Sequence, residues 1–323
     1  MTRRPPQLDL GIAEPANQRL SFSGHETFVF RYGWLKKAVD AIERDPGIFN
    51  DDSAIVALGV GKNMVRSIRH WGLATGVLSE EPKSRGNRLG VSSFGRFLFG
   101  EGGKDPYLED PNSLWLLHWN LFRQDTRATT WSWAFGKLPS NEFTRDSMLD
   151  LIRTELRQRQ APIPSEGVLK RDVDVFVRTY APSKASKAGV LEDSLDCPLV
   201  ELHLIEESSN AGHFRIRRGP KPTLSDQTFV YTLLEFWEEA SAAQETLAFN
   251  EIAYRAGSPG SVFKLDENNI LDRLERLELI TEGALTYVET AGIRQVYRSR
   301  SVDRVSCLEN YYTSSFVPVE IGG

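Results

Sequence analysis

Apolar residues recur at helical spacing through the first hundred positions. The pattern predicts a helix near 34–42, a short helix that ends at Gly59, and a third helix over 62–73. Two short apolar runs then flank a polar segment at 83–88, which predicts two strands joined by a basic tip. A winged helix contains a helix, a tight turn, a second helix and a β-hairpin in this order, so we interpret residues 21–105 as such a domain.

The middle of the chain, 106–190, is predicted to be helical. Residues 114–122 are apolar on nearly every side, which is typical of a buried helix. Thr144 can cap a following helix. The run 169–180 fits both helical spacing and the alternation of a strand, and we favour a helix that ends before Pro182.

The last third of the chain contains both the alternating pattern of strands and the spacing of helices. Apolar and polar residues alternate from Val200 and again over 213–217, which predicts a β-hairpin within 191–222. Helical spacing and a later strand pair predict a second winged-helix-like domain over 223–323. Residues 1–20, rich in Pro, Gln and Arg, predict a disordered arm. The predicted fold is mainly α with small β-hairpins (α+β), with two winged-helix modules joined by a helical middle region.

Charge is segregated along the 323 residues, whose formal total is −5. Residues 62–96 carry seven Lys and Arg against two Glu, a local charge of +5. Residues 264–278 carry three Lys and Arg against five Asp and Glu, a local charge of −2. Clustered cations are typical of phosphate binding, and an acidic module is repelled by phosphate. The residues predicted to contact DNA are Arg31, Lys62, Asn63, Arg66, Arg69, Lys83, Arg85 and Arg88. The alternative is a basic winged helix that contacts only proteins.

Other features narrow the class of protein. No apolar run reaches the roughly 18 to 20 residues of a membrane helix, and nothing resembles a signal peptide, so we expect a cytoplasmic protein without membrane contact. Cys197 and Cys307 lie too far apart for a cysteine metal motif. Motifs for nucleotide hydrolysis, dinucleotide binding, zinc proteolysis and serine hydrolysis are not found in the sequence.

Four blocks of sequence, in order, carry a family resemblance. They are Phe22–Phe28 with Arg31–Lys37, Gly59–Val65, Leu169–Phe176, and Arg218–Leu224. Together they resemble a bacterial family of uncharacterised-domain proteins encoded beside sulfur-transfer genes for DNA phosphorothioation. The resemblance implies a DNA-nicking component that acts on double-stranded DNA with a cysteine desulfurase, an ATP pyrophosphatase and an ATPase. It supplies no catalytic motif, and the chain could also form a homodimer.

Nicking a phosphodiester normally requires carboxylates that hold Mg²⁺ or another divalent metal, together with a general base. His25 and Glu26 combine a base and a carboxylate near Arg31, and the alternative is that they anchor a loop and cap a helix. Asp172 and Asp174 are further catalytic candidates, but in a helix they lie about 200° apart, which disfavours a shared metal. We expect Asp174 to pair with Arg178 instead.

A second candidate metal site lies on the predicted hairpin. Glu201 and His203 would share one face of a strand, and His213 could face them from its neighbour. The alternative is a set of cross-strand charge pairs. The sequence therefore predicts a metal-dependent DNA nickase of a phosphorothioation system, with a non-catalytic DNA-recognition subunit as the alternative. A winged-helix transcriptional regulator is a third possibility, which the family resemblance disfavours.

Overall fold

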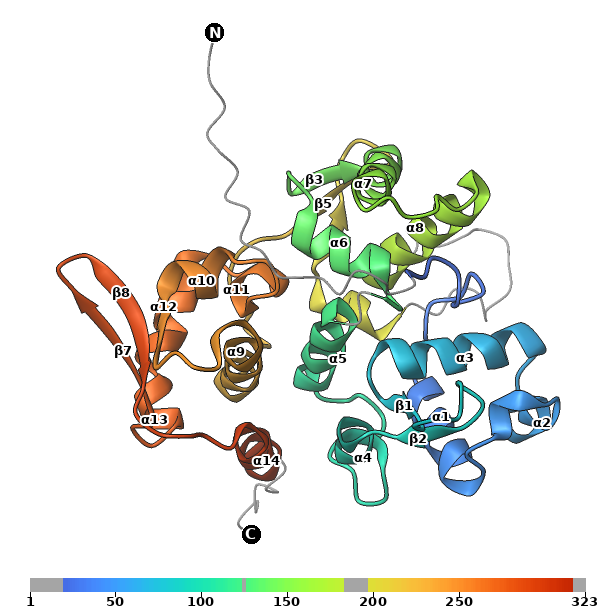
Figure 1. The fold of residues 1–323 in the computed structure, drawn as a ribbon, viewed down its shortest axis with the longest axis horizontal. Helices are drawn as coiled ribbons and strands as arrows, with labels where there is room; N and C mark the ends of the chain where they lie inside the picture. Colours follow the sequence, from blue (N-terminus) through green and yellow to red (C-terminus); the bar gives the residue numbers. More distant parts are fainter. Residues whose placement is uncertain (1–19, 124–125, 183–196, 316–323) are drawn as a thin grey trace, which may run out of the picture.

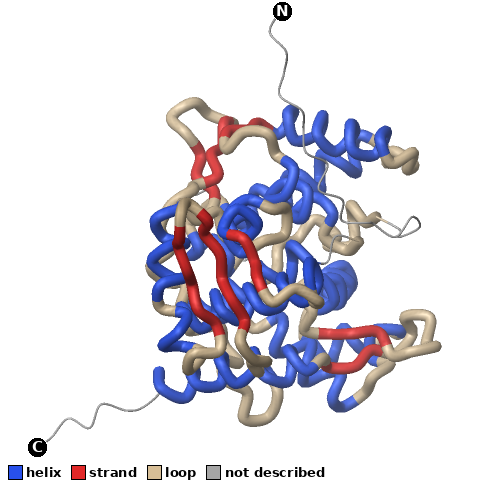
Figure 2. The backbone as a smooth tube through the Cα atoms, turned by 60° about the vertical axis from the view of Figure 1, so that its left-hand side comes forward, coloured by secondary structure: helices blue, strands red, loops and turns tan. Residues whose placement is uncertain are grey.

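The computed structural model describes residues 20–123, 126–182 and 197–315. The predicted arm at 1–20 lies outside these ranges, apart from Leu20. Within them, helices form most of the molecule and small antiparallel sheets lie at its outside (Figure 1, Figure 2), which confirms the predicted α+β class. No helix in the described ranges is both long and apolar enough to cross a lipid bilayer.

The N-terminal part contains short helices followed by a two-stranded sheet. Its elements are α1 (Trp34–Arg44), η1 (Ile48–Asn50), α2 (Ser53–Leu58), α3 (Lys62–Ala74), β1 (Leu78–Glu80) and β2 (Leu89–Val91). Helix α2 ends at Gly59, whose φ of 65° is a left-handed conformation that glycine adopts without steric cost. Helix α3 packs against α1. The strands pair antiparallel, as predicted.

The middle of the chain is helical. Its helices are α4 (Ser93–Phe99), α5 (Pro111–Arg123), α6 (Thr129–Lys137), α7 (Arg145–Gln158) and α8 (Glu166–Tyr180). Helix α5 is buried along most of its length, which confirms the prediction for 114–122. Thr144 caps α7 by accepting a hydrogen bond from the backbone N–H of Ser147. The ambiguous run 169–180 is helical, as favoured.

The second sheet differs from the predicted hairpin. Strands β4 (Ile205–Glu207) and β5 (His213–Ile216) pair antiparallel, but β3 (Glu142–Thr144) pairs with the other edge of β5. The alternation from Val200 predicts a strand there, and this prediction is wrong because Pro198–Leu202 forms a short 3-10 helix, η2. This helix packs against α5 and α8, so both of its neighbours bury its apolar side chains.

The C-terminal part repeats the order of helices followed by paired strands. Its elements are α9 (Asp226–Ser241), β6 (Thr246–Ala248), α10 (Phe249–Tyr254), α11 (Pro259–Val262), α12 (Glu267–Glu275), α13 (Leu277–Ile280), β7 (Leu285–Thr290), β8 (Ile293–Arg298) and α14 (Arg304–Ser315). Strand β8 lies between β6 and β7. Helices α12 and α13 follow each other directly and are divided at Arg276.

Helix α5 joins these parts into one continuous hydrophobic core. Its His118 lies 2.8 Å from the hydroxyl of Tyr180 in α8 and 3.1 Å from the backbone oxygen of Val262 in α11. Because a carbonyl only accepts, Nε2 carries the proton and the tyrosine hydroxyl donates to Nδ1. Burial lowers the pKa of His118 to about 3, so the ring is neutral at physiological pH.

Candidate nucleic-acid interface

Helix α3 presents a polar N-terminal half to solvent. Its apolar face, which includes Val65 and Ile68, is buried, and this leaves Lys62, Asn63 and Arg66 exposed. The helical pattern places these three residues on the outer face, as predicted. Because the first N–H groups of a helix carry partial positive charge, this end of α3 is suited to a polyanion.

The C-terminal half of α3, which includes the predicted DNA contact Arg69, is more buried than its N-terminal half. Ser67 is fully buried, and its Oγ has no hydrogen-bond partner in the described part of the chain. His70 points inward against Trp71, with ring centroids 5.3 Å apart, and burial lowers its pKa to about 3. Arg69 is half-buried and donates to the backbone oxygen of Gly86 at 2.9 Å. Arg69 therefore tethers the loop between β1 and β2 to α3.

The loop between β1 and β2 carries exposed cations beside α3. Lys83, Arg85 and Arg88 are exposed, and Arg88 pairs with Glu81 at 3.0 Å. Lys83 and Arg85 adopt positive φ values of 66° and 54°, in a tight turn. Neither has an ion pair with any residue in the described ranges. Their charge is therefore available to a ligand.

Two of the exposed cations of α3 each pair with one carboxylate. Asp52 lies 3.0 Å from the ammonium of Lys62, and Glu26 lies 3.7 Å from the guanidinium of Arg66. All four side chains are at least one-third exposed, so water screens both pairs and each is worth little free energy. Phosphate groups can therefore compete for these cations at small cost.

The catalytic candidates separate into a buried pair and two surface residues. His25 Nε2 lies 2.8 Å from Asp172 Oδ1, and the hydroxyl of Thr130 donates to Oδ2 of the same carboxylate. The backbone N–H of Thr27 donates to His25 Nδ1 at 3.1 Å, so Nε2 carries the ring proton and donates to Asp172. His25 and Asp172 are about 2% and 1% exposed. This burial favours a structural link, and a catalytic role stays a prediction.

The two aspartates of α8 point in different directions, as their spacing predicts. Asp172 is buried, whereas Asp174 is exposed and pairs with Arg145 of α7 at 2.6 Å. The predicted pair between Asp174 and Arg178 is wrong, because Arg145 reaches the carboxylate from the neighbouring helix. Arg178 donates instead to the backbone oxygen of Thr27 at 2.5 Å.

The candidate metal residues of the predicted hairpin do not share a strand. Glu201 lies in η2 and accepts a hydrogen bond from Tyr32, whereas His203 follows that helix with a positive φ of 49°. His213 begins β5, where Thr144 is opposite it. Within the described ranges, no group of three His, Cys, Asp or Glu side chains converges to hold a metal ion. The strand geometry on which this site depends is thus not formed.

Arg31 lies next to the first helix rather than on the outer face of α3. Its guanidinium carbon is 5.6 Å from the centre of the Trp34 ring, a cation–π contact. Arg31 is half-buried and has a further interaction beyond this one. A DNA contact by Arg31 stays a prediction.

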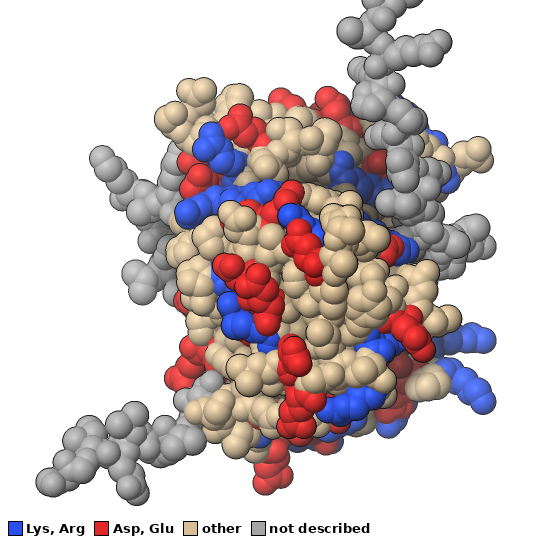
Figure 3. All heavy atoms as spheres, turned by 90° about the vertical axis from the view of Figure 1, so that its left-hand side faces the viewer, with Lys and Arg blue, Asp and Glu red and all other residues tan. Residues whose placement is uncertain are grey.

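Helices α12 and α13, which precede the paired strands β7 and β8 as α3 precedes β1 and β2, are acidic at their surface. Asp226 binds both of its nearby arginines, Arg273 at 2.8 Å and Arg276 at 2.5 Å. The exposed carboxylates of α12 and α13 are Glu267, Asp272, Glu275 and Glu278. Figure 3, which views this side of the molecule, shows acidic side chains interspersed with Lys and Arg. This face is poorly suited to a polyanion.

Sequence reasoning missed the connections between distant residues. Thr130 completes the hydrogen bonding of Asp172 across 42 positions of sequence, and no local pattern indicates it. Arg127 pairs with Glu80 of β1 at 2.9 Å and was not a candidate. Arg171 and Arg178 lie seven positions apart, which places them on one side of a helix. That spacing was a usable signal.

Comparisons with known proteins give one family and one solved fold. Residues 22–312 match the family described as a protein of unknown function (DUF4007). An SspB crystal structure is similar at 30% identity and a TM-score of 0.82, over 93% of this chain and 90% of that one. A magnesium ion-bound SspB crystal structure is similar at 30% identity and a TM-score of 0.81, over 94% and 91%. No curated protein matches the chain. These matches confirm the family resemblance seen in the four sequence blocks.

Proposed function

The chain belongs to the DUF4007 family and shares the fold of SspB, and from this premise we propose that it is the DNA-binding component of a DNA phosphorothioation system. Its ligand is duplex DNA, bound by α3 and by the loop between β1 and β2. The observation that carries the proposal is the exposed, basic N-terminal half of α3 beside a loop that exposes Lys83 and Arg85.

The order of elements from α1 to β2 supports a winged-helix interpretation of this part. Helix α3 would enter the major groove as the second helix of a helix-turn-helix, and the β1–β2 loop would act as the wing on an adjacent backbone. Asn63 and Arg66 have side chains suited to adenine and guanine edges, whereas Lys83 and Arg85 would contact phosphates. The hydrogen bond from Arg69 to Gly86 would keep helix and wing in register.

Salt dependence tests this proposal. Replacing both Lys83 and Arg85 by Ala should weaken binding of a labelled duplex and reduce the slope of log affinity against log salt by about two. Arg157→Ala is the matched control, since Arg157 is an exposed cation of α7 away from this surface. Equal slopes for the wild type and the double variant would exclude the loop as a DNA contact.

Nicking of one strand is a second candidate, favoured by the magnesium ion bound in a similar SspB structure. The side chains that the structure describes do not fit a ready Mg²⁺ site: Asp172 is already bonded to His25 and Thr130, and Asp174 lies against Arg145. Magnesium needs free oxygen ligands at short distance. Neither carboxylate therefore offers free oxygen ligands to Mg²⁺ in this structure.

A plasmid assay separates nicking from recognition. Supercoiled plasmid is incubated with the purified chain in Mg²⁺ or in EDTA, with and without a cysteine desulfurase, an ATP pyrophosphatase and an ATPase from one such system. Open circles formed by the chain alone in Mg²⁺ would support the nickase. Binding without cleavage under every condition would support a recognition subunit that positions DNA for its partners.

A further inference from the structure

An open pocket of about 330 Å³ lies beside the loop that carries His25 and Glu26. Its lining residues are Thr27, Arg145, Arg171, Asp174 and Arg178. Three guanidinium groups and one carboxylate thus surround a space that solvent reaches. The excess of positive charge selects an anion, and the planar donors of arginine match phosphate oxygens.

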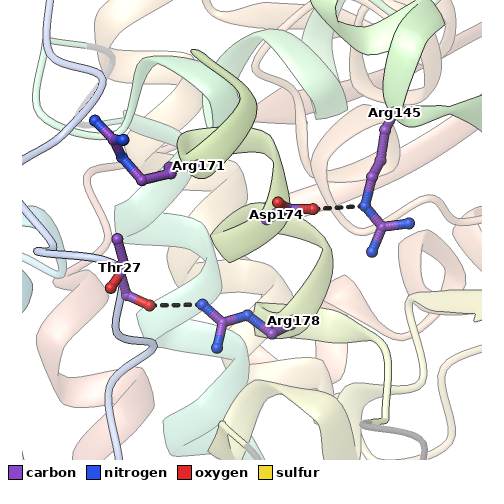
Figure 4. Close-up of a pocket in the computed structure, with 5 residues that line it drawn as sticks. All are labelled: Thr27, Arg145, Arg171, Asp174 and Arg178. Carbon is purple, nitrogen blue, oxygen red and sulfur yellow. Dashed lines mark hydrogen bonds and ion pairs between the residues drawn. The ribbon is translucent and has the colours of Figure 1, made fainter. Parts of the chain in front are cut away.

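Helix α8 supplies most of the pocket from one of its faces. Positions 171, 174 and 178 follow the i, i+3, i+7 spacing of a helix face. Figure 4 shows Asp174 turned toward Arg145 of α7, whereas Arg171 and Arg178 lie on the side of Thr27. Arg171 is exposed and forms no ion pair with any residue in the described ranges. It is therefore the cation best placed to receive a ligand.

The loop at 26–27, which contributes Thr27 to the pocket lining, is held in place before any ligand binds. Glu26 and Thr27 adopt positive φ values of 49° and 70°, which residues other than glycine rarely adopt. Arg178 binds the backbone oxygen of Thr27, and the backbone N–H of Thr27 donates to His25. Glu26 pairs with Arg66 of α3. The same loop thus contacts both the proposed DNA-reading helix and the arginine pocket.

We propose that this pocket is a phosphate-binding site that receives a backbone phosphate of the DNA held by α3. The proposal rests on the proposed DNA binding and extends the contact surface from α3 across the 26–27 loop to α8. A free nucleotide would present the same chemistry, because its phosphate carries the same oxygens. Asp174 limits the positive charge of the site by pairing with Arg145.

The test compares two neighbouring cations of α8. Arg171→Ala should weaken binding of a labelled duplex several-fold at low salt and reduce the salt slope by about one. Lys170→Ala removes the same charge one position away, from a side chain that pairs with Glu166 outside the pocket, and should leave both quantities close to wild type. Asp174→Asn should tighten duplex binding, because Asp174 is the one carboxylate among the described residues that line the pocket.

Separate measurements with ATP, in the absence of metal, identify the source of the phosphate. If Arg171→Ala weakens ATP binding and leaves duplex binding unchanged, the pocket binds a nucleotide phosphate, and its proposed contact with the DNA backbone is overturned. Arg171→Ala could also change neither ATP binding nor duplex binding. If the Lys83 and Arg85 double variant then still weakens duplex binding, the pocket proposal is overturned and the proposed DNA binding stands. If the wild type binds no duplex, the proposed function fails, and the ATP result alone decides the pocket.

Discussion

His25 and Asp172 lie 147 positions apart in the sequence and 2.8 Å apart in the fold. The imidazole belongs to the loop that precedes α1, and the carboxylate belongs to the buried side of α8. Because Thr130 binds the second oxygen of Asp172, the carboxylate is satisfied by two donors inside the protein. The pair thus connects the basic N-terminal part to the helical middle and fixes the loop at 26–27 between them.

Removal of this carboxylate should destabilise the fold. Asp172→Ala leaves two buried donors without an acceptor, and we expect the free energy of unfolding to fall by about 3 kcal/mol, measured by urea denaturation. Asp174→Ala is the control on the same helix, where an exposed pair should cost less than about 1 kcal/mol. Unchanged stability of Asp172→Ala together with loss of nicking would instead indicate a catalytic carboxylate.

Local patterns were sufficient for the helices of the N-terminal part. The glycine at 59 and the apolar spacing of α3 determine where α2 ends and α3 begins, because both signals act within a few residues. The same reasoning failed at Val200, since alternation over five residues does not distinguish a strand from a 3-10 helix buried on both sides. Strand β3 was missed because its partner, β5, lies about seventy positions away.

The candidate site shows the same division between local and distant information. The exposure of Lys62, Asn63 and Arg66 follows from helical periodicity alone. Periodicity does not predict that Arg69 turns toward Gly86, because this hydrogen bond depends on how the β1–β2 loop folds back onto α3. The pairing of Asp174 with Arg145 likewise depends on the packing of α7 against α8.

Stability should decrease in mild acid. Burial lowers the pKa of His70 and His118 to about 3, whereas an unfolded histidine titrates near 6.5. Below pH 6.5 the unfolded chain gains protons that the folded chain does not accept. Stability is therefore complete above pH 6.5 and decreases toward pH 3, by about 1.4 kcal/mol for each histidine at pH 5.5.

A variant of one histidine checks this origin of the acid sensitivity. Urea denaturation at pH 7.5 and 5.5 should show a smaller loss for His118→Gln than for the wild type, although the variant starts from a lower stability. His213→Gln replaces an exposed ring at the start of β5 and should keep the wild-type pH dependence. If both variants lose as much stability as the wild type on acidification, His118 is not a source of the effect.

Gly95 should not tolerate a side chain. A Cβ atom there would lie 2.1 Å from the backbone oxygen of Val77, so α4 would have to move away from the segment that leads into β1. We expect Gly95→Ala to lower the free energy of unfolding by about 1–3 kcal/mol. Gly167→Ala, in an open position of α8 with its nearest neighbour at 3.8 Å, should raise it by about 0.5–1 kcal/mol. Chemical denaturation should show changes of opposite sign in the free energy of unfolding for the two variants. Changes of the same sign would contradict the packing described at Gly95.

Glu26 should restrain DNA binding through Arg66. The carboxylate lies 3.7 Å from the guanidinium and competes with phosphate for it, so Glu26→Gln should tighten duplex binding about two- to five-fold at low salt. Arg66→Ala should weaken binding; if the side chain contacts phosphate the salt slope falls by about one, and if it contacts guanine the sequence preference relaxes. Glu43→Gln makes the same change of net charge on an exposed position of α1 and measures the non-specific effect. An equal gain from Glu26→Gln and Glu43→Gln would show that net charge alone is responsible and that Arg66 does not meet the DNA.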